Sequence, residues 1–143
     1  MNRASVAAFV VSVFALLLLV QQRAIIAQGV IGITIQICAV FLMIWARVRF
    51  GRRSFHASAV PTEGGLVTTG PYRFIRHPIY ASILYIIWAA IVSHWSLING
   101  GLGLIITFCA AVRIVAEEHL VIMKYPDYTS YAARTKRIIP YII

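Results

Sequence analysis

The chain alternates long apolar stretches with short polar segments, and the apolar stretches lie at 4–20, 25–46, 79–92 and 97–115. A helix needs about 20 apolar residues to cross the roughly 30 Å hydrocarbon core of a bilayer. The second and fourth stretches meet that length, the first is borderline and the third is short. Turn-prone residues, Ser93 to Ser96 and Asn99-Gly100-Gly101, join the third and fourth stretches, so we expect a tight helical hairpin there. The pattern predicts an all-α polytopic membrane protein with about four transmembrane helices.

The polar residues after the fourth stretch continue its helix. No helix-breaking residue occurs before Tyr125-Pro126, so we expect the helix to run on through Glu117 and Glu118 toward Met123. Residues 126–135 then predict a short amphipathic helix that ends before Pro140. Tyr128 and Tyr131 lie three residues apart on one face of it, which we expect to pack on the preceding polar loop or to lie among lipid headgroups.

Composition supports a membrane protein and excludes a separate soluble catalytic domain. Of the 143 residues, 61% are hydrophobic and only 12% are charged, with a mean hydropathy of +0.86. Such a chain is too apolar for a soluble domain of this size. Cys38 and Cys109 both lie inside apolar stretches, without the spacing of a metal site, so we expect no bound metal.

Basic residues are distributed unevenly between the connections and predict the orientation. The first and third connections hold only Arg23, whereas the second connection and the segment after the fourth stretch hold Arg47, Arg49, Arg52, Arg53, Arg73, Arg76, Lys124, Arg134, Lys136 and Arg137. The excess of positive charge on cytoplasmic loops places both polar regions in the cytoplasm. The same bias, with attraction to anionic headgroups, accounts for the net charge of +9 without a nucleic-acid partner.

The segment Gly70–Tyr80 concentrates arginine, histidine and tyrosine between two apolar stretches. Pro78 fits the first position of a helix and His77 fits its N-cap. The N–H groups that follow are then available to an anion. The segment is therefore a candidate binding loop.

Arg113 and Glu117 are spaced i,i+4 and so share one face of the fourth helix. Such a pair is usually a local ion pair, but ionisable groups at membrane depth are costly and commonly mark a functional site. Glu118 is rotated by about 100° from Glu117, so we expect it to meet the arginines of the polar loop instead.

Several of these motifs, in this order, resemble the isoprenylcysteine carboxyl methyltransferase and phospholipid methyltransferase superfamily. The resemblance covers residues from about 46 onward and is carried by Leu66–Tyr72, Arg76–Tyr80, Glu117-Glu118, Tyr128, Tyr131, Arg137 and Pro140. It implies one integral membrane domain, residues 1–143, with a two-span part at 1–46 and a cofactor-binding and catalytic part at 47–143. It also implies that S-adenosylmethionine binds on the cytoplasmic face and that a lipid-borne group is methylated.

The resemblance assigns roles to individual residues. Arg113 goes to the substrate, and Arg113, Glu117 and Glu118 to the catalytic set. The cofactor is expected against Gly64, Gly65, Leu66, Val67, Tyr72, Arg76, His77, Pro78, Ile79, Tyr80 and Glu117. These residue types suit the cofactor, because a carboxylate can bind its ammonium, tyrosine rings can face its cationic centres, and N–H donors or basic groups can bind its carboxylate.

The methyl acceptor is open at this stage. A carboxylate, such as that of an isoprenylcysteine, is already ionised, and Arg113 would orient it; this is the expectation we favour. An amine, such as that of a phospholipid, or a thiol must lose a proton, for which His77 or Glu118 would be the base. The sequence does not predict the oligomeric state.

Two other classes of protein compete with this interpretation. The ending Arg137–Ile143 and the His-Pro-x-Tyr element also resemble membrane sterol reductases, which use NADPH, but those proteins are much longer. A non-catalytic membrane partner protein would leave Arg113, Glu117 and His77 without a purpose.

Overall fold

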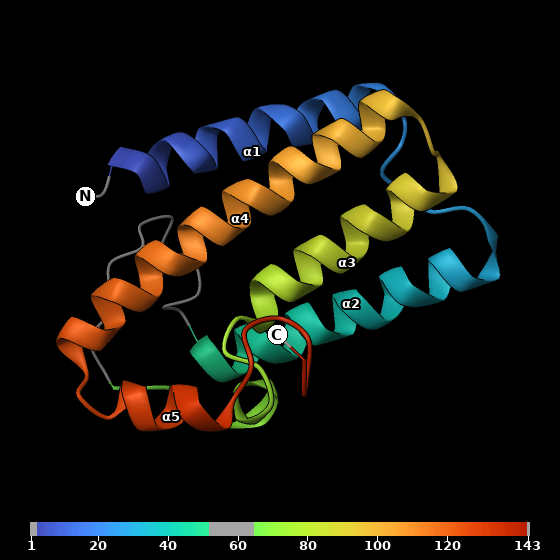
Figure 1. The fold of residues 1–143 in the computed structure, drawn as a ribbon. Helices are drawn as coiled ribbons and strands as arrows, with labels where there is room; N and C mark the ends of the chain where they lie inside the picture. The colour runs from blue at the N-terminus through green and yellow to red at the C-terminus, as the bar shows by residue number, and fades with distance from the viewer. Residues whose placement is uncertain (1–2, 52–64, 143) are drawn as a thin grey trace.

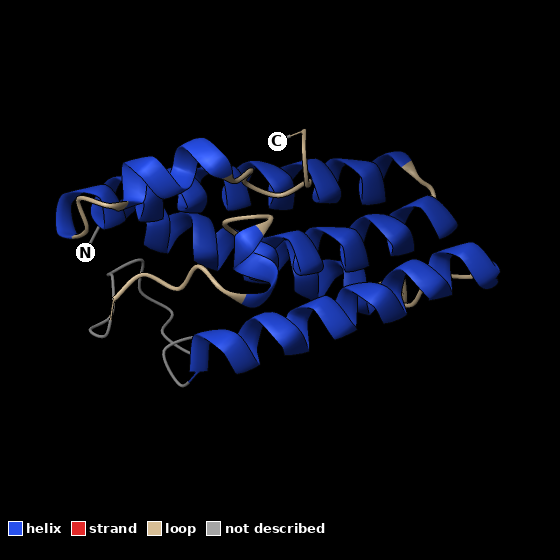
Figure 2. Ribbon diagram, turned by 90° about the horizontal axis from the view of Figure 1, so that it is seen from below, coloured by secondary structure: helices blue, strands red, loops and turns tan. Residues whose placement is uncertain are grey.

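The computed structural model describes residues 3–51 and 65–142, which form helices and one isolated pair of bridged residues. In chain order the elements are α1 (Arg3–Gln21), α2 (Gly29–Phe50), the 3-10 turn η2 (Gly70–Arg73), α3 (Pro78–Ser93), α4 (Leu97–Lys124) and α5 (Tyr128–Arg134). The all-α architecture expected from the sequence is confirmed for these residues (Figures 1 and 2).

The long helices form two antiparallel pairs, α1 with α4 and α2 with α3 (Figure 1). Of the described helices, α1, α2 and α4 are long and apolar enough to cross a membrane. The 16 residues of α3 are apolar but span only about 24 Å, less than the roughly 30 Å hydrocarbon core. The short third stretch of the sequence is thus a short helix, and its complete passage through a bilayer stays a prediction.

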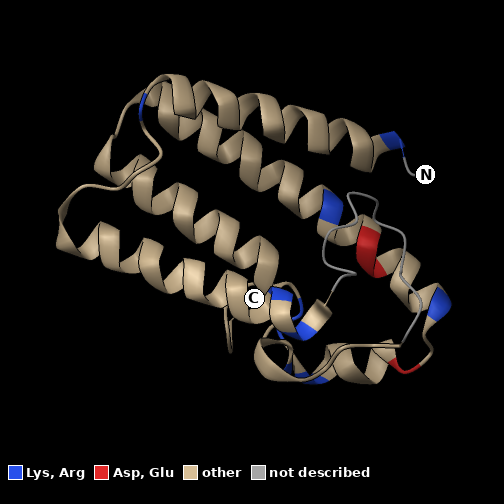
Figure 3. Ribbon diagram, turned by 180° about the vertical axis from the view of Figure 1, so that it is seen from behind, with Lys and Arg blue, Asp and Glu red and all other residues tan. Residues whose placement is uncertain are grey.

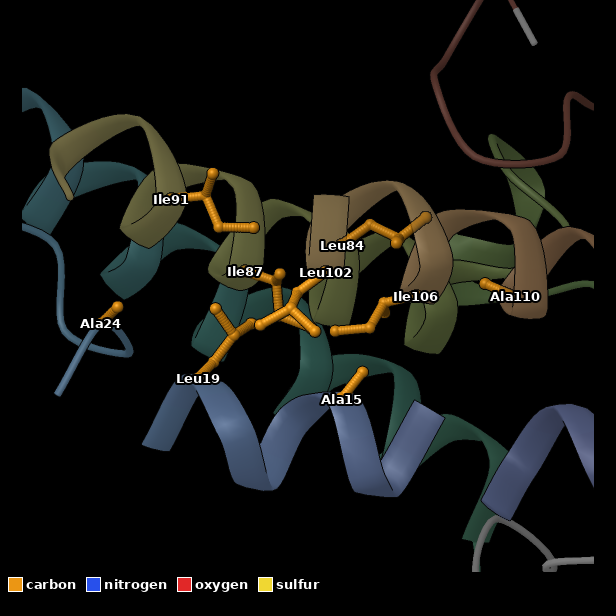
Figure 4. Packing of buried hydrophobic residues seen from close by; sticks show 9 residues of the cluster. All are labelled: Ala15, Leu19, Ala24, Leu84, Ile87, Ile91, Leu102, Ile106 and Ala110. Carbon is orange, nitrogen blue, oxygen red and sulfur yellow. The ribbon is translucent and has the colours of Figure 1, made fainter. Parts of the chain in front are cut away.

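The two pairs pack together around one apolar cluster. It draws side chains from α1, α3, α4 and the first connection, namely Ala15, Leu19, Ala24, Leu84, Ile87, Ile91, Leu102, Ile106 and Ala110 (Figure 4). Outside it the helices expose large apolar side chains, such as Phe41 at 68% and Phe108 at 71%. Such exposure suits a protein whose surroundings are lipid rather than water.

The second apolar stretch begins its helix later than expected. Residues 25–28 were predicted as part of a span, but α2 begins only at Gly29. The side chain of Gln36 explains the difference, because its Oε1 accepts from the N–H of Ala27 at 2.9 Å and its Nε2 donates to the carbonyl of Ile25 at 2.8 Å. An irregular backbone is stable at this depth only when such partners satisfy it.

The predicted turn at Asn99-Gly100-Gly101 is wrong, because these residues form the first turns of α4. Ser96 caps this helix, its side-chain oxygen accepting from the N–H of Asn99 at 3.0 Å. The amide of Asn99 donates back to the carbonyl of His94 at 2.7 Å. The reversal is therefore confined to residues 94–96, and the hairpin itself is confirmed.

Among residues 3–51 and 65–142, most charged residues gather at one end of the bundle, which we call the site end. It holds the C-terminal half of α4, α5, η2 and the start of α3. Figure 3 shows the acidic band of α4 at this end, where blue bands of lysine and arginine also mark neighbouring segments. The extension of α4 to Lys124 and the short α5 agree with the sequence expectation. This extension carries Glu117 and Glu118 to the polar loop.

Candidate functional site at the charged end of the bundle

The start of α3 sets the position of the Arg-His-Pro segment. His77 is the N-cap and Pro78 occupies the first turn, as the sequence predicts. The His77 ring makes no cap hydrogen bond, and it turns toward α4 instead. Before it, Gly70 adopts φ +63°, and a Cβ there would lie 2.7 Å from Cγ of Arg49. Glycine therefore allows the loop to approach α2 closely.

Arg113, Tyr80 and Glu117 form a hydrogen-bonded chain between α3 and α4. Nε of Arg113 donates to the hydroxyl of Tyr80 at 3.1 Å, and that hydroxyl donates to Oε1 of Glu117 at 2.5 Å. Nη2 of Arg113 lies 3.9 Å from the same carboxylate oxygen. The expected i,i+4 pair is thus present, and Tyr80 bridges it. We call these three residues the inner chain.

Helix α1 holds Arg113 from the other side. Nη1 of Arg113 donates to the backbone carbonyl of Ser5 at 3.2 Å, and its guanidinium lies 5.1 Å from the ring centre of Phe9. Arg113 is only 8% exposed. Burial of a cation at this depth requires such partners. The sequence reasoning missed both residues of α1, because neither stands out in a helix that is apolar along its length.

His77 lies between the two glutamates of α4. Its Nε2 is 3.2 Å from Oε1 of Glu118, and its Nδ1 is 3.9 Å from Oε2 of Glu117. The ring also packs edge-on against Tyr80, with 5.8 Å between ring centres. His77 therefore joins the inner chain to a second cluster around Glu118.

Glu118 is the centre of that second cluster. Its carboxylate accepts from Nε of Arg76 at 3.0 Å, from Nη2 of Arg137 at 2.8 Å and from the hydroxyl of Tyr128 at 3.3 Å. The side chain is 10% exposed, and the expectation that it meets the arginines of the loop is confirmed for Arg76. We call Glu118 with its four partners, His77 included, the Glu118 cluster. A carboxylate so fully bonded holds protein segments together.

The segment after α5 is bound along Arg76 and His77, which we call the Arg-His loop. The N–H of Arg76 donates to the carbonyl of Lys136 at 2.6 Å, and the N–H of His77 donates to that of Arg137 at 3.0 Å. The guanidinium of Arg76 also donates to the carbonyls of Ala132 and Thr135. We call Thr135–Arg137 the strap. It fixes both backbone and side chain of Arg76.

Tyr131 of α5 packs on the polar loop, which was one of the two positions expected for this face of the helix; the other was among lipid headgroups. The hydroxyl of Tyr131 donates to the carbonyl of Tyr72 at 2.7 Å. Burial raises the pKa of the Tyr131 hydroxyl to about 12. Burial likewise raises the pKa of the Tyr72 hydroxyl, with smaller contributions from neighbouring charges that include Glu117. Both hydroxyls therefore stay protonated to a higher pH than an exposed tyrosine would.

The structure brings together most of the predicted site residues. Arg76, His77, Tyr80, Arg113, Glu117 and Glu118 all belong to the two connected clusters. Pro78 is buried and Ile79 half-buried in the first turn of α3. Gly65 (φ +83°), Leu66 and Val67 lie in the irregular segment before η2, outside the two clusters. Gly64 lies outside the described residues.

Neither cluster has the composition of a metal centre. Among residues 3–51 and 65–142, no group of three or more histidine, cysteine, aspartate or glutamate side chains is arranged to hold a metal ion. The carboxylates are neutralised by arginine instead. The inner chain offers a half-buried carboxylate, Glu117 at 24% side-chain exposure, beside a tyrosine and an arginine. This combination suits an organic ligand that carries charges of both signs.

Comparison with known proteins agrees with that chemistry. The family model of phospholipid methyltransferases matches residues 24–128. A nickel-cobalt-cadmium resistance protein, NccN, of Alcaligenes xylosoxydans xylosoxydans is 29% identical over 119 residues, which cover 82% of this chain and 50% of the relative. The chain thus spans about half the length of that curated relative. No solved structure matches the present chain. The matched residues include Arg76, His77, Tyr80, Arg113, Glu117 and Glu118, but not α1. The protein belongs to the phospholipid methyltransferase family.

Proposed function

We propose that the protein transfers a methyl group from S-adenosylmethionine to a lipid-borne acceptor at the site end. The observation that carries the proposal is the chain of contacts from Arg113 through Tyr80 and Glu117 to His77 in a member of a membrane methyltransferase family. Membership of that family implies this methyl donor.

The residues of the inner chain suit S-adenosylmethionine chemically. Glu117 can pair with the ammonium group, because its carboxylate keeps 24% of the side chain exposed. Tyr80 offers an aromatic face for a cationic centre. The N–H groups of Ile79 and Tyr80, at the start of α3, cannot bond within the helix, so they can meet the carboxylate of the cofactor. Gly65 to Val67 and Tyr72 complete the proposed set.

The bound cofactor would supply the methyl group, and the protein would hold the acceptor in line with it, away from water. Because Glu118 is bonded to two arginines, we assign it a positioning role within the proposed catalytic set. Arg113 and Glu117 stay as the residues that meet substrate and cofactor.

For the acceptor we propose a carboxylate, as in an isoprenylcysteine-like lipid. Arg113 supports this choice, because it is a planar double donor at the level where a lipid headgroup would arrive. Its present contacts with Ser5 and Tyr80 orient the guanidinium toward Glu117. The alternative acceptor is a phospholipid amine, which the description of the matching family model favours. In that case His77 is the candidate base.

Methyl transfer to a small panel of lipids distinguishes the two acceptors. We expect labelled methyl to enter a prenylcysteine when the protein, in phosphatidylcholine vesicles, is supplied with S-adenosylmethionine. Arg113→Lys should lose most of this activity, because a point charge replaces a two-pronged donor. Binding of S-adenosylhomocysteine should change little in the same variant.

The control for that experiment is Arg134→Lys, since Arg134 is exposed and its Nε donates to the carbonyl of Ser130 in its own helix. It should keep full activity. Methylation of an ethanolamine lipid, with full activity in Arg113→Gln, would overturn the carboxylate proposal and support the amine.

We also propose that the site faces the cytoplasm, as the distribution of basic residues predicts. Thr129→Cys on α5 and Leu97→Cys at the start of α4, both exposed positions, report on opposite ends of the bundle. In intact cells, a membrane-impermeant maleimide should label position 97 and spare position 129 until the cells are opened. Labelling of position 129 from outside would reverse the orientation.

A further inference from the structure

The segment that follows the strap turns back along α3. Directly after Arg137, the carbonyl of Ile138 accepts a hydrogen bond from the hydroxyl of Tyr85 at 2.9 Å. The side chain of Ile138 packs against the apolar cluster of the bundle. Figure 1 shows this last part of the chain beside the first turns of α3. The segment therefore leaves the charged loop and lies against a membrane helix.

The depth of the segment follows from its position along α3. Tyr85 lies seven residues after Pro78, or about 10 Å along the helix axis. Side chains lean toward the N-terminus of their helix, so Ile138 lies level with Tyr85 or nearer to the site end. With α3 as the expected third span, its start lies near the membrane boundary at the site end. Ile138 then lies no more than about 10 Å along α3 from that boundary.

The residues after Ile138 are apolar, and their side chains point away from the protein. Ile139 is 38% exposed, Ile142 is 68% exposed and Tyr141 is 85% exposed. No charged residue occurs from Ile138 to Ile142. Exposure of such side chains to water is unfavourable, and tyrosine is enriched where membrane and water meet.

We propose that Ile138–Ile142 is a membrane hook, inserted among the acyl chains of the leaflet at the site end. A second copy of the chain is a poorer partner, because a few exposed side chains offer far less than the roughly 1,200 to 2,000 Å² of a stable interface. The hook is continuous with the strap, whose carbonyls bind the N–H groups of Arg76 and His77. Insertion therefore holds the Arg-His loop in place.

Electron spin resonance of the full chain in phosphatidylcholine vesicles tests the hook. A nitroxide at Tyr141→Cys, in a background with Cys38 and Cys109 replaced by serine, is compared with one at Thr129→Cys. Oxygen concentrates in lipid and a charged nickel chelate stays in water. We expect oxygen to relax the nitroxide at position 141 more than the nickel chelate does. The nickel chelate should be the stronger relaxing agent for the nitroxide at position 129, on the exposed face of α5.

Two results would overturn the proposal. Equal nickel accessibility at positions 141 and 129 would place the segment in water. Dipolar broadening between labels at 141, lost on dilution with unlabelled protein, would identify a second copy as the partner. Neither outcome depends on the proposed methyl transfer.

A second experiment tests whether the hook supports the Arg-His loop. Tyr141→Asp should weaken S-adenosylhomocysteine binding several-fold. Unchanged binding would show that the hook does not hold the Arg-His loop in place.

Discussion

Replacement of Glu118 by glutamine should destabilise the protein more than any other single change at the site end. The variant keeps the shape of the side chain but removes the charge that Arg76, 11% exposed, and Arg137 share. Breaking a buried ion pair in this way typically costs 3–5 kcal/mol. Because Arg137 is 47% exposed and can be solvated, we expect about 3 kcal/mol. Reversible unfolding in mixed detergent micelles measures the loss.

Asp127→Asn is the matched control for Glu118→Gln. Asp127 is exposed at the start of α5 and its side chain makes no cap hydrogen bond. The unfolding free energy of the Asp127→Asn variant should therefore stay near the wild-type value. Detachment of the strap should also make the Glu118→Gln chain more susceptible to trypsin after Lys136. An unfolding free energy equal to that of the control would show that the Glu118 cluster does not hold the strap.

Replacement of Glu117 by alanine should affect the ligand more than the fold, because Arg113 keeps its contacts with Ser5 and Phe9 of α1. Glu117 is half-buried, and its removal leaves Tyr80 bonded to Arg113. A charge-assisted hydrogen bond to the cofactor ammonium is worth about 1.5–3 kcal/mol, so affinity for S-adenosylhomocysteine should fall about 10- to 150-fold.

His119→Ala is the control, since His119 is exposed on α4 two residues further on. Calorimetric titration of both variants in the same detergent gives the comparison. Equal affinity in Glu117→Ala and His119→Ala would remove Glu117 from the cofactor pocket.

The helices were predictable because their apolar stretches are long and their ends carry clear signals. Pro78 predicts the start of α3, and Tyr125-Pro126 predicts the end of α4. The position of Glu118 followed from helix geometry alone, since about 100° of rotation separates it from Glu117. These features depend on neighbours in the sequence.

The features that the sequence did not predict depend on contacts between distant segments. Ser5 and Phe9 meet Arg113 only because α1 pairs with α4, and an apolar helix shows no preferred face in its sequence. The strap pairs with residues 75–77 through backbone groups, which leave no pattern of side chains. Gln36 could have been noticed as a polar residue in a span, but its partners at residues 25 and 27 could not.

The division into a two-span part and a catalytic part, at residue 46, stays a prediction. Ala46 lies within α2, which continues to Phe50. The contacts of Arg113 with Ser5 and Phe9 link the first helix to the inner chain.

The central claim is that the site end binds S-adenosylmethionine. Calorimetric titration of the purified full chain with S-adenosylhomocysteine, and separately with NADPH, tests it most directly. We expect saturable binding of one S-adenosylhomocysteine per chain, weakened by Glu117→Ala, and no heat of binding with NADPH. Binding of NADPH without binding of S-adenosylhomocysteine would contradict the claim and favour a reductase.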